Sequence, residues 1–305
     1  MENFDDIFAP KGEEKPEQQP AQEGKLSWAE KRKQERQAMF DMVDAATERL
    51  KVSGEAFQDY LDVQSRFDRY SMRNAILIAH QNKDAVKLAT FEDWKADGIS
   101  IQKGAKSITI MVPSTYRKAG GEQGNGFNAG KVFDISQTTA VAAETKITHD
   151  PRRLLEALVR NAPCPIEIRN NPQAEYAARF DPQAEYAARF DPQSRKIYVK
   201  QGLDADTLFR CITQEVAVAE YAKGHRKRSE CDFDASCIAY ILCKRFGVPT
   251  DSFSFDKLPE RLSRTENKAV HAELDGIRET ANRLSEGMQQ ILAPRQRSDK
   301  NRDAR

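Results

Sequence analysis

Apolar residues recur every three or four positions through several long stretches of this chain, which is the spacing of amphipathic helices. Ser27 and Glu30 have the spacing of a capping box and mark the start of the first stretch. Asp150 followed by Pro151 marks another start. The predicted helices are Trp28–Leu50, two helices between Gly54 and Gln81 that meet near Asp68–Ser71, Phe91–Ala96 after Thr90 and ended by Gly98, Pro151–Val159, Asp204–Ala222, Glu230–Phe246 and Thr265–Leu292.

Shorter apolar runs between these helices predict strands. Ile99–Gln102 and Ser107–Val112 flank Lys103–Lys106, which is the pattern of a hairpin, and the Gly-rich stretch Tyr116–Gly130 predicts a mobile β-loop. Other strands are expected at Lys87–Ala89, Lys131–Ile135, Ile166–Ile168 and Lys196–Val199. The fold class is therefore α+β, with helices and a small antiparallel sheet followed by a mainly helical part with a short sheet.

A chain of 305 residues can bury two ordinary cores, so two domains are expected. Residues 1–26 are rich in Glu, Gln and Pro and predict a disordered acidic tail, and residues 294–305 predict a disordered basic one. Residues 139–149 lapse into Ala and Thr and predict a linker. The first domain is then 27–138, the second 150–258, followed by a C-terminal helix within 259–293.

Residues 172–181 and 182–191 are both PQAEYAARFD, a perfect tandem decapeptide. Two units are too few for a solenoid. Identity without drift indicates a recent duplication inside a tolerant surface loop. The alternative is a short extra helix, because AEYAARF favours that state.

Composition narrows the class of protein. The net charge of +1 counts against an acidic DNA mimic. The N-terminus has no secretory signal pattern, and no apolar run reaches the roughly 20 residues that span a bilayer, so we expect a cytoplasmic protein without a membrane partner. The five cysteines have no C-x-x-C spacing and are expected to be reduced thiols.

The stretch from Tyr60 to Val112 interleaves aromatic and cationic residues. Aromatic faces stack on unpaired bases, while Arg and Lys neutralise phosphates without reading sequence. The alternative is structural, because aromatics at helical spacing commonly form the core and the cations between them lie on the surface.

Three segments favour the first interpretation: YLDVQSRFDRYSMRNAILIAHQ, FEDWKADGISIQKGAKSITIMVP and KVFDISQT. In order and spacing they resemble the N-terminal single-stranded-DNA-binding domain of ArdC-type antirestriction proteins, over roughly residues 55–138. The resemblance implies a protein of a mobile genetic element that protects or handles transferred single strands, with restriction or conjugation proteins as further partners. The DNA-binding residues expected from it and from the aromatic and cationic pattern are Arg69, Tyr70, Ser71, Arg73, Asn74, Trp94, Lys103 and Lys106.

The segments LFRCITQEVAVAEYA and SECDFDASCIAYILCKRFGV resemble the zincin-like peptidase domain of ArdC-type proteins and of ImmA/IrrE-type metallopeptidases. Those enzymes carry H-E-x-x-H on the first helix and an acidic ligand on the next. Here the matching positions are Gln214, Glu215 and Val218, with Asp234 as the acid, or Ser236 if the register shifts by two.

Gln is a poor zinc ligand and Val is none, so neither metal nor any other cofactor is expected. Glu215 would be the vestige of a lost catalytic site. Two rival functions stay open: a metallopeptidase with an atypical zinc site, and an inhibitor of restriction enzymes that acts through protein contacts.

Overall fold

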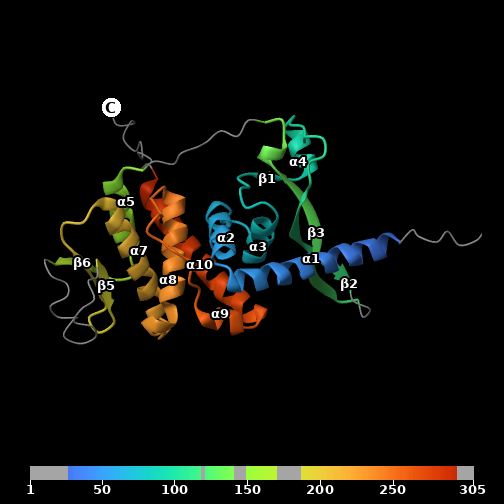
Figure 1. Cartoon of the computed structure of the whole chain (residues 1–305). Coiled ribbons are helices and arrows are strands. Elements are labelled where there is room, and N and C mark those ends of the chain that lie inside the picture. Colours follow the sequence, from blue (N-terminus) through green and yellow to red (C-terminus); the bar gives the residue numbers. More distant parts are fainter. Residues whose placement is uncertain (1–26, 118–120, 141–148, 170–186, 294–305) are drawn as a thin grey trace, which may run out of the picture.

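The computed structural model describes residues 27–117, 121–140, 149–169 and 187–293. Both predicted tails, most of the predicted linker and the first decapeptide copy lie outside these residues. The described part is α+β, as predicted, with one small sheet at each end of a helical middle (Figure 1).

The first three helices follow the sequence prediction. Helix α1 (Trp28–Val52) begins with the predicted capping box, in which Glu30 N–H donates to Ser27 Oγ at 3.3 Å and Ser27 N–H donates to the Glu30 carboxylate at 2.8 Å. Helices α2 (Gly54–Arg66) and α3 (Met72–Gln81) meet across residues 67–71. A Cβ on Gly54 would lie 2.2 Å from the Phe255 carbonyl oxygen, so only glycine permits this approach of α2 to the segment around Phe255.

The predicted hairpin around Lys103–Lys106 is wrong. Strand β1 (Leu88–Ala89) and α4 (Phe91–Ala96) form as expected, but Ile99–Gln102 forms no strand. Instead β2 (Ile108–Arg117) pairs antiparallel with β3 (Gln123–Asp134) in a sheet of order β1-β3-β2. The stretch predicted as a β-loop is thus largely paired strand, because its glycines lie opposite large side chains of β2.

The second half contains α5 (Pro151–Asn161) and a sheet of β4 (Ile166–Arg169), β6 (Lys196–Lys200) and β5 (Ala188–Asp191). In this sheet β4 runs parallel to the central β6 and β5 runs antiparallel to it. Helices α7 (Ala205–Ala222), α8 (Arg228–Phe246), α9 (Glu260–Arg264) and α10 (Asn267–Leu292) complete the described chain. The short α9 was not predicted.

The tandem decapeptide is not wholly a surface loop. The last four residues of its second copy form β5, and Ala188 and Phe190 point into the core. In residues 188–191 the alternative of an extra helix is excluded, because Phe190 pairs with Ile197 of β6; the rest of the repeat, up to residue 186, lies outside the described residues. Alternation of apolar and charged residues in ARFD is compatible with a strand, but only the neighbouring β6 selects it.

One apolar cluster runs through both halves. It joins side chains of α2 and α3, such as Phe57 and Ile76, to those of α8 and α10, such as Ile241 and Ile277. The division into two domains stays a prediction, and the core beneath it is continuous. Among the helices in the described ranges, none combines the length and apolar character needed to cross a membrane.

Candidate functional site

The α2–α3 junction displays part of the predicted DNA-binding group. Ser71 caps α3, and its hydroxyl accepts from the Asn74 N–H at 3.3 Å. The junction is held from the opposite side by Asn282 of α10, whose side chain donates to the Asp68 carbonyl at 3.0 Å. Arg69 is exposed in the turn, and Arg73 is half-buried on the first turn of α3. The cations therefore stand on an ordered turn.

Tyr70 is half-buried at the same junction. Its ring meets Phe67 edge-on, with centroids 5.6 Å apart and an interplanar angle of 88°. Burial raises the pKa of the Tyr70 hydroxyl. The ring is fixed against Phe67 and keeps part of its surface in solvent, and a stacking platform needs such an accessible aromatic surface.

Asn74 serves the fold. Its side chain accepts from the Met111 N–H at 2.7 Å and donates to the Met111 carbonyl at 3.0 Å. Gln81, seven residues further along α3, makes the same pair of bonds to Thr109. Together they satisfy the outer edge of β2, which has no strand beside it in the described chain. The Asn74 amide therefore has a structural role, and its contact with DNA stays a prediction.

Trp94 is also a core residue. Its side chain has no exposed surface, and the indole N–H donates to the Phe133 carbonyl at 2.9 Å. The predicted stacking on DNA is excluded because no face of the ring reaches solvent. The α4 helix carries it at the end of the sheet near β1 and β3 (Figure 1).

Lys103 and Lys106 are exposed in the loop between α4 and β2. Gly104 turns this loop with a φ of +85°, and Gln137 donates to the Lys106 carbonyl at 2.7 Å. This hydrogen bond ties the loop to the 3-10 turn Ile135–Gln137, which follows β3. The structure thus places these lysines in a segment separate from the α2–α3 junction.

Tyr116 is an exposed aromatic that the sequence analysis missed. Half of its surface is open, and its ring lies against Gly124 and Gly126 of β3. A Cβ on Gly124 would come within 2.7 Å of the ring, so glycine is needed for the ring to lie on the strand. The two glycines at alternate positions, Gly124 and Gly126, were the available signal.

Glu215 stands in the second half, buried on α7. Arg228 at the start of α8 donates a hydrogen bond to each carboxylate oxygen, from Nη1 to Oε2 at 2.7 Å and from Nη2 to Oε1 at 2.5 Å. The Phe190 N–H of β5 donates to the same carboxylate at 2.7 Å. A general base needs a free oxygen directed at a water, and both oxygens are engaged here.

The other positions matched to zinc ligands do not converge on Glu215. The Gln214 side chain donates to Ser236 Oγ at 3.1 Å, so the alternative register of α8 faces α7. Asp232, one helical turn before Ser236, pairs with Arg228 at 3.1 Å. Sequence analysis missed both Arg228 and Asp232. Within the described ranges, no group of three or more His, Cys, Asp or Glu side chains is placed to hold a metal ion.

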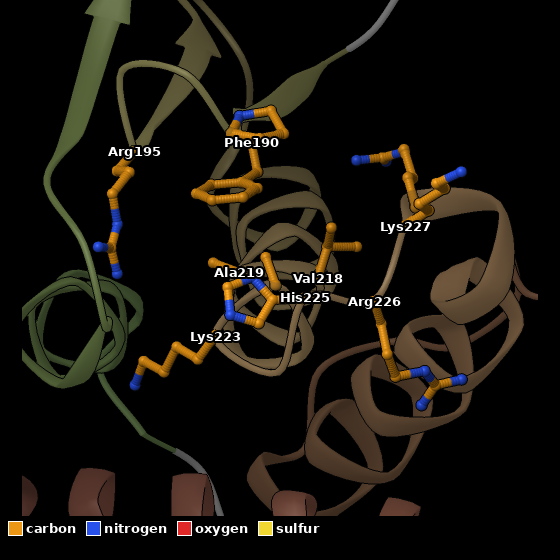
Figure 2. Close-up of a pocket in the computed structure, with 11 residues that line it drawn as sticks. Phe190, Arg195, Val218, Ala219, Lys223, His225, Arg226 and Lys227 are labelled. Atoms are coloured by element: carbon orange, nitrogen blue, oxygen red, sulfur yellow. The ribbon is translucent and has the colours of Figure 1, made fainter.

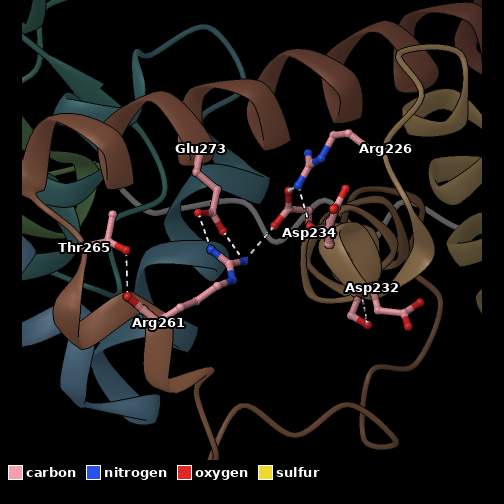
Figure 3. A network of polar contacts seen from close by, with 8 residues as sticks. Arg226, Asp232, Asp234, Arg261, Thr265 and Glu273 are labelled. Atoms are coloured by element: carbon pink, nitrogen blue, oxygen red, sulfur yellow. Dashed lines mark hydrogen bonds and ion pairs between the residues drawn. The ribbon is translucent and has the colours of Figure 1, made fainter.

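Asp234 points to another side of α8 (Figure 3). It pairs with Arg226 at 2.9 Å and with Arg261 at 3.6 Å, and Arg261 also holds Glu273 of α10. Burial, and then the neighbouring Glu273 carboxylate, raise the pKa of Asp234 to about 7. Its predicted place as the acidic ligand is wrong, because it joins α8 to α10 instead.

Comparison with known proteins identifies the first half. Residues 33–149 match the family model described as the N-terminal domain of anti-restriction factor ArdC. No curated protein sequence matches the chain.

Two solved structures share the fold. The metal-free crystal structure of the antirestriction ArdC protein from the R388 plasmid aligns with a TM-score of 0.57 and 16% identity, covering 82% of this chain and 99% of that chain. The Mn(II)-bound structure of that protein aligns with a TM-score of 0.51 and 16% identity, covering 84% and 100%. The predicted resemblance is thereby confirmed over residues 33–149, and the likeness of fold extends to most of the chain.

Proposed function

We propose that this chain, which carries an ArdC-type N-terminal domain over residues 33–149, is a single-stranded-DNA-binding protein of the antirestriction type from a mobile genetic element. Support comes from the family match and from the shared fold with an antirestriction protein of a plasmid. Restriction or conjugation proteins would be its further partners. The observation that carries the DNA-binding proposal is the α2–α3 junction, which holds the exposed Arg69, the half-buried Tyr70 and, on the first turn of α3, the half-buried Arg73.

The chemistry at this junction suits unpaired bases. An open aromatic face accepts any base, and its stacking contributes about 1–3 kcal/mol per base. The two arginines would contact phosphates on either side. Duplex DNA keeps its bases stacked on one another, so the same surface should bind it less tightly.

The exposed ring of Tyr116 is a second platform, and Lys103 and Lys106 are further phosphate contacts. They lie on β2 and on the loop before it, away from the junction. A strand that follows this surface would contact residues from several segments of the domain. Binding of that kind depends on the backbone and carries little sequence preference.

Fluorescence anisotropy with single-stranded and duplex DNA of equal length, at several salt concentrations, tests the proposal. Tyr70→Ala should weaken binding of the single strand by about 1–3 kcal/mol. Lys103→Ala with Lys106→Ala should reduce the salt slope without changing preference among sequences. Trp28→Ala is the control, since this exposed ring lies outside the matched residues. A folded Tyr70→Ala protein that binds like wild type would remove the stacking assignment.

We also propose that the second half is a peptidase-like scaffold without peptidase activity. The guanidinium of Arg228 supplies beside Glu215 the positive charge that a metal would supply in a zincin. Metal analysis of the purified protein tests this, and one equivalent of zinc lost on Glu215→Gln would refute it. The triple variant Gln214→His, Val218→His, Arg228→Ala places imidazoles at the two positions that match the zinc-binding histidines and removes the guanidinium that pairs with Glu215. This variant should bind zinc if the scaffold is zincin-like.

A further inference from the structure

A cavity of about 450 Å³ lies where the β5–β6 turn meets the end of α7 and the turn into α8 (Figure 2). Phe190 and Val218 form its apolar wall, and Figure 2 shows them between Arg195 and Lys223 on one side and Lys227 on the other. The volume is within the range of small-molecule sites.

The rim of this cavity is cationic. Six of its lining residues carry basic side chains and none of the lining residues in the described chain is acidic: Arg195, Lys223, His225, Arg226, Lys227 and Arg228. Three of the six already serve carboxylates, with Lys223 bound to Glu220, Arg226 to Asp234 and Arg228 to Glu215.

The other basic side chains at the rim include those of Arg195 and Lys227. Neither Arg195 nor Lys227 makes an ion pair with any carboxylate of the residues that the structure describes. They stand on different elements, one on the β5–β6 turn and one just before α8. Figure 2 shows them on opposite sides of Phe190 and Val218.

The backbone of the cavity is strained at two points. Arg195 has a φ of +54° and His225 a φ of +61°, and these are the two non-glycine residues with positive φ in the described chain. Both line the cavity. The left-handed region disfavours side chains, so such positions persist where the surroundings fix them, and they gather at ligand sites.

We propose that this cavity binds a nucleotide. Arg195 and Lys227 would hold the phosphate, with an imidazole N–H of His225 as a further donor, and the base or sugar would lie against Phe190 and Val218. A wall of this kind favours a phosphate that carries an apolar planar group over the free ion. The site is independent of the residues proposed above for single-stranded DNA.

Isothermal titration of the full chain tests the assignment with deoxyadenosine monophosphate, deoxyadenosine and inorganic phosphate. The monophosphate should bind saturably, and the other two at least tenfold more weakly. Arg195→Gly with Lys227→Ala should weaken monophosphate binding at least tenfold. Arg160→Ala with Arg264→Ala removes the same charge from exposed sites elsewhere and should change nothing.

The choice of Arg195→Gly separates an effect on binding from an effect on folding. Glycine adopts positive φ without strain, so Arg195→Gly alone should raise the melting temperature while it weakens binding. The assignment is overturned if wild type shows no saturable binding, if the double variant binds the monophosphate as wild type does, or if inorganic phosphate binds as tightly as the monophosphate.

The nucleotide can be free or the end of a strand. An oligonucleotide with a 5′-phosphate that binds more tightly than its 5′-hydroxyl form, and loses that advantage in the double variant, identifies a strand end. Equal affinities of the two forms, with saturable monophosphate binding, identify a free nucleotide. Tyr70→Ala should leave monophosphate binding unchanged, so failure of the DNA-binding proposal and failure of this one are distinguishable.

Discussion

Removal of the Arg228 side chain tests how much the two-point ion pair between Arg228 and Glu215, called the clamp below, contributes to stability. Arg228→Ala leaves a carboxylate that is 5% exposed with the Phe190 N–H as its remaining donor among the bonds described above. Loss of one partner from a buried pair costs about 3–5 kcal/mol. Because the Arg228 side chain is 21% exposed and one donor remains, we expect the lower end, about 3 kcal/mol.

Glu215→Gln removes the charge and keeps the shape. Arg228 retains Asp232 at 3.1 Å in that variant, so we expect a loss of about 1–2 kcal/mol. The double variant Arg228→Ala, Glu215→Gln buries no unpaired charge and should be more stable than Arg228→Ala alone. The coupling in this cycle should be roughly 2 kcal/mol.

Urea unfolding followed by circular dichroism gives the four stabilities, with equal m-values as the check that the unfolded states are alike. Arg264→Ala is the control, since this side chain is 79% exposed and its ion pair with Glu260 contributes under about 1 kcal/mol. If Arg228→Ala is no less stable than this control, or if the cycle is additive within about 0.5 kcal/mol, the clamp does not hold Glu215.

Three further perturbations follow from the contacts described above. Asn74→Ala leaves a backbone N–H and C=O of β2 unpaired and should cost about 2–4 kcal/mol in urea unfolding; unchanged stability with weakened DNA binding would return this residue to the DNA site. Deletion of residues 182–191 gives the same sequence as deletion of 172–181, so the remaining copy should form β5 and the melting temperature should hold; a large drop would show that both copies are needed. Because the raised pKa of Asp234 makes the folded protein bind this proton more tightly than the unfolded chain, stability should fall as pH rises from about 4 to 7, and Asp234→Asn should flatten that fall in unfolding titrations.

Local patterns in the sequence were sufficient to predict the longer helices, although not the short α9. The capping box at Ser27 and the apolar periodicity after it depend on residues within a few positions of one another, so they are legible without the fold. The ArdC-type resemblance of the first half was legible for the same reason, because it rests on short motifs in order. The absence of histidine at the two matching positions, which are Gln214 and Val218, could likewise be read directly from the residue types.

Partners distant along the chain were decided by the tertiary structure. An aromatic residue at helical spacing can serve the core or a ligand, and only its complete burial and its hydrogen bond to the Phe133 carbonyl assign Trp94 to the core. The glycines of β3 predicted a loop from the sequence, and only the pairing with β2 in the structure assigns them to a strand. Arg228 gave no signal in sequence, since its contact with Glu215 exists only because α8 packs against α7 after an intervening turn. Residue types and short-range spacing are properties of the chain, whereas the partner of a buried charge or a strand edge is set by how the elements pack.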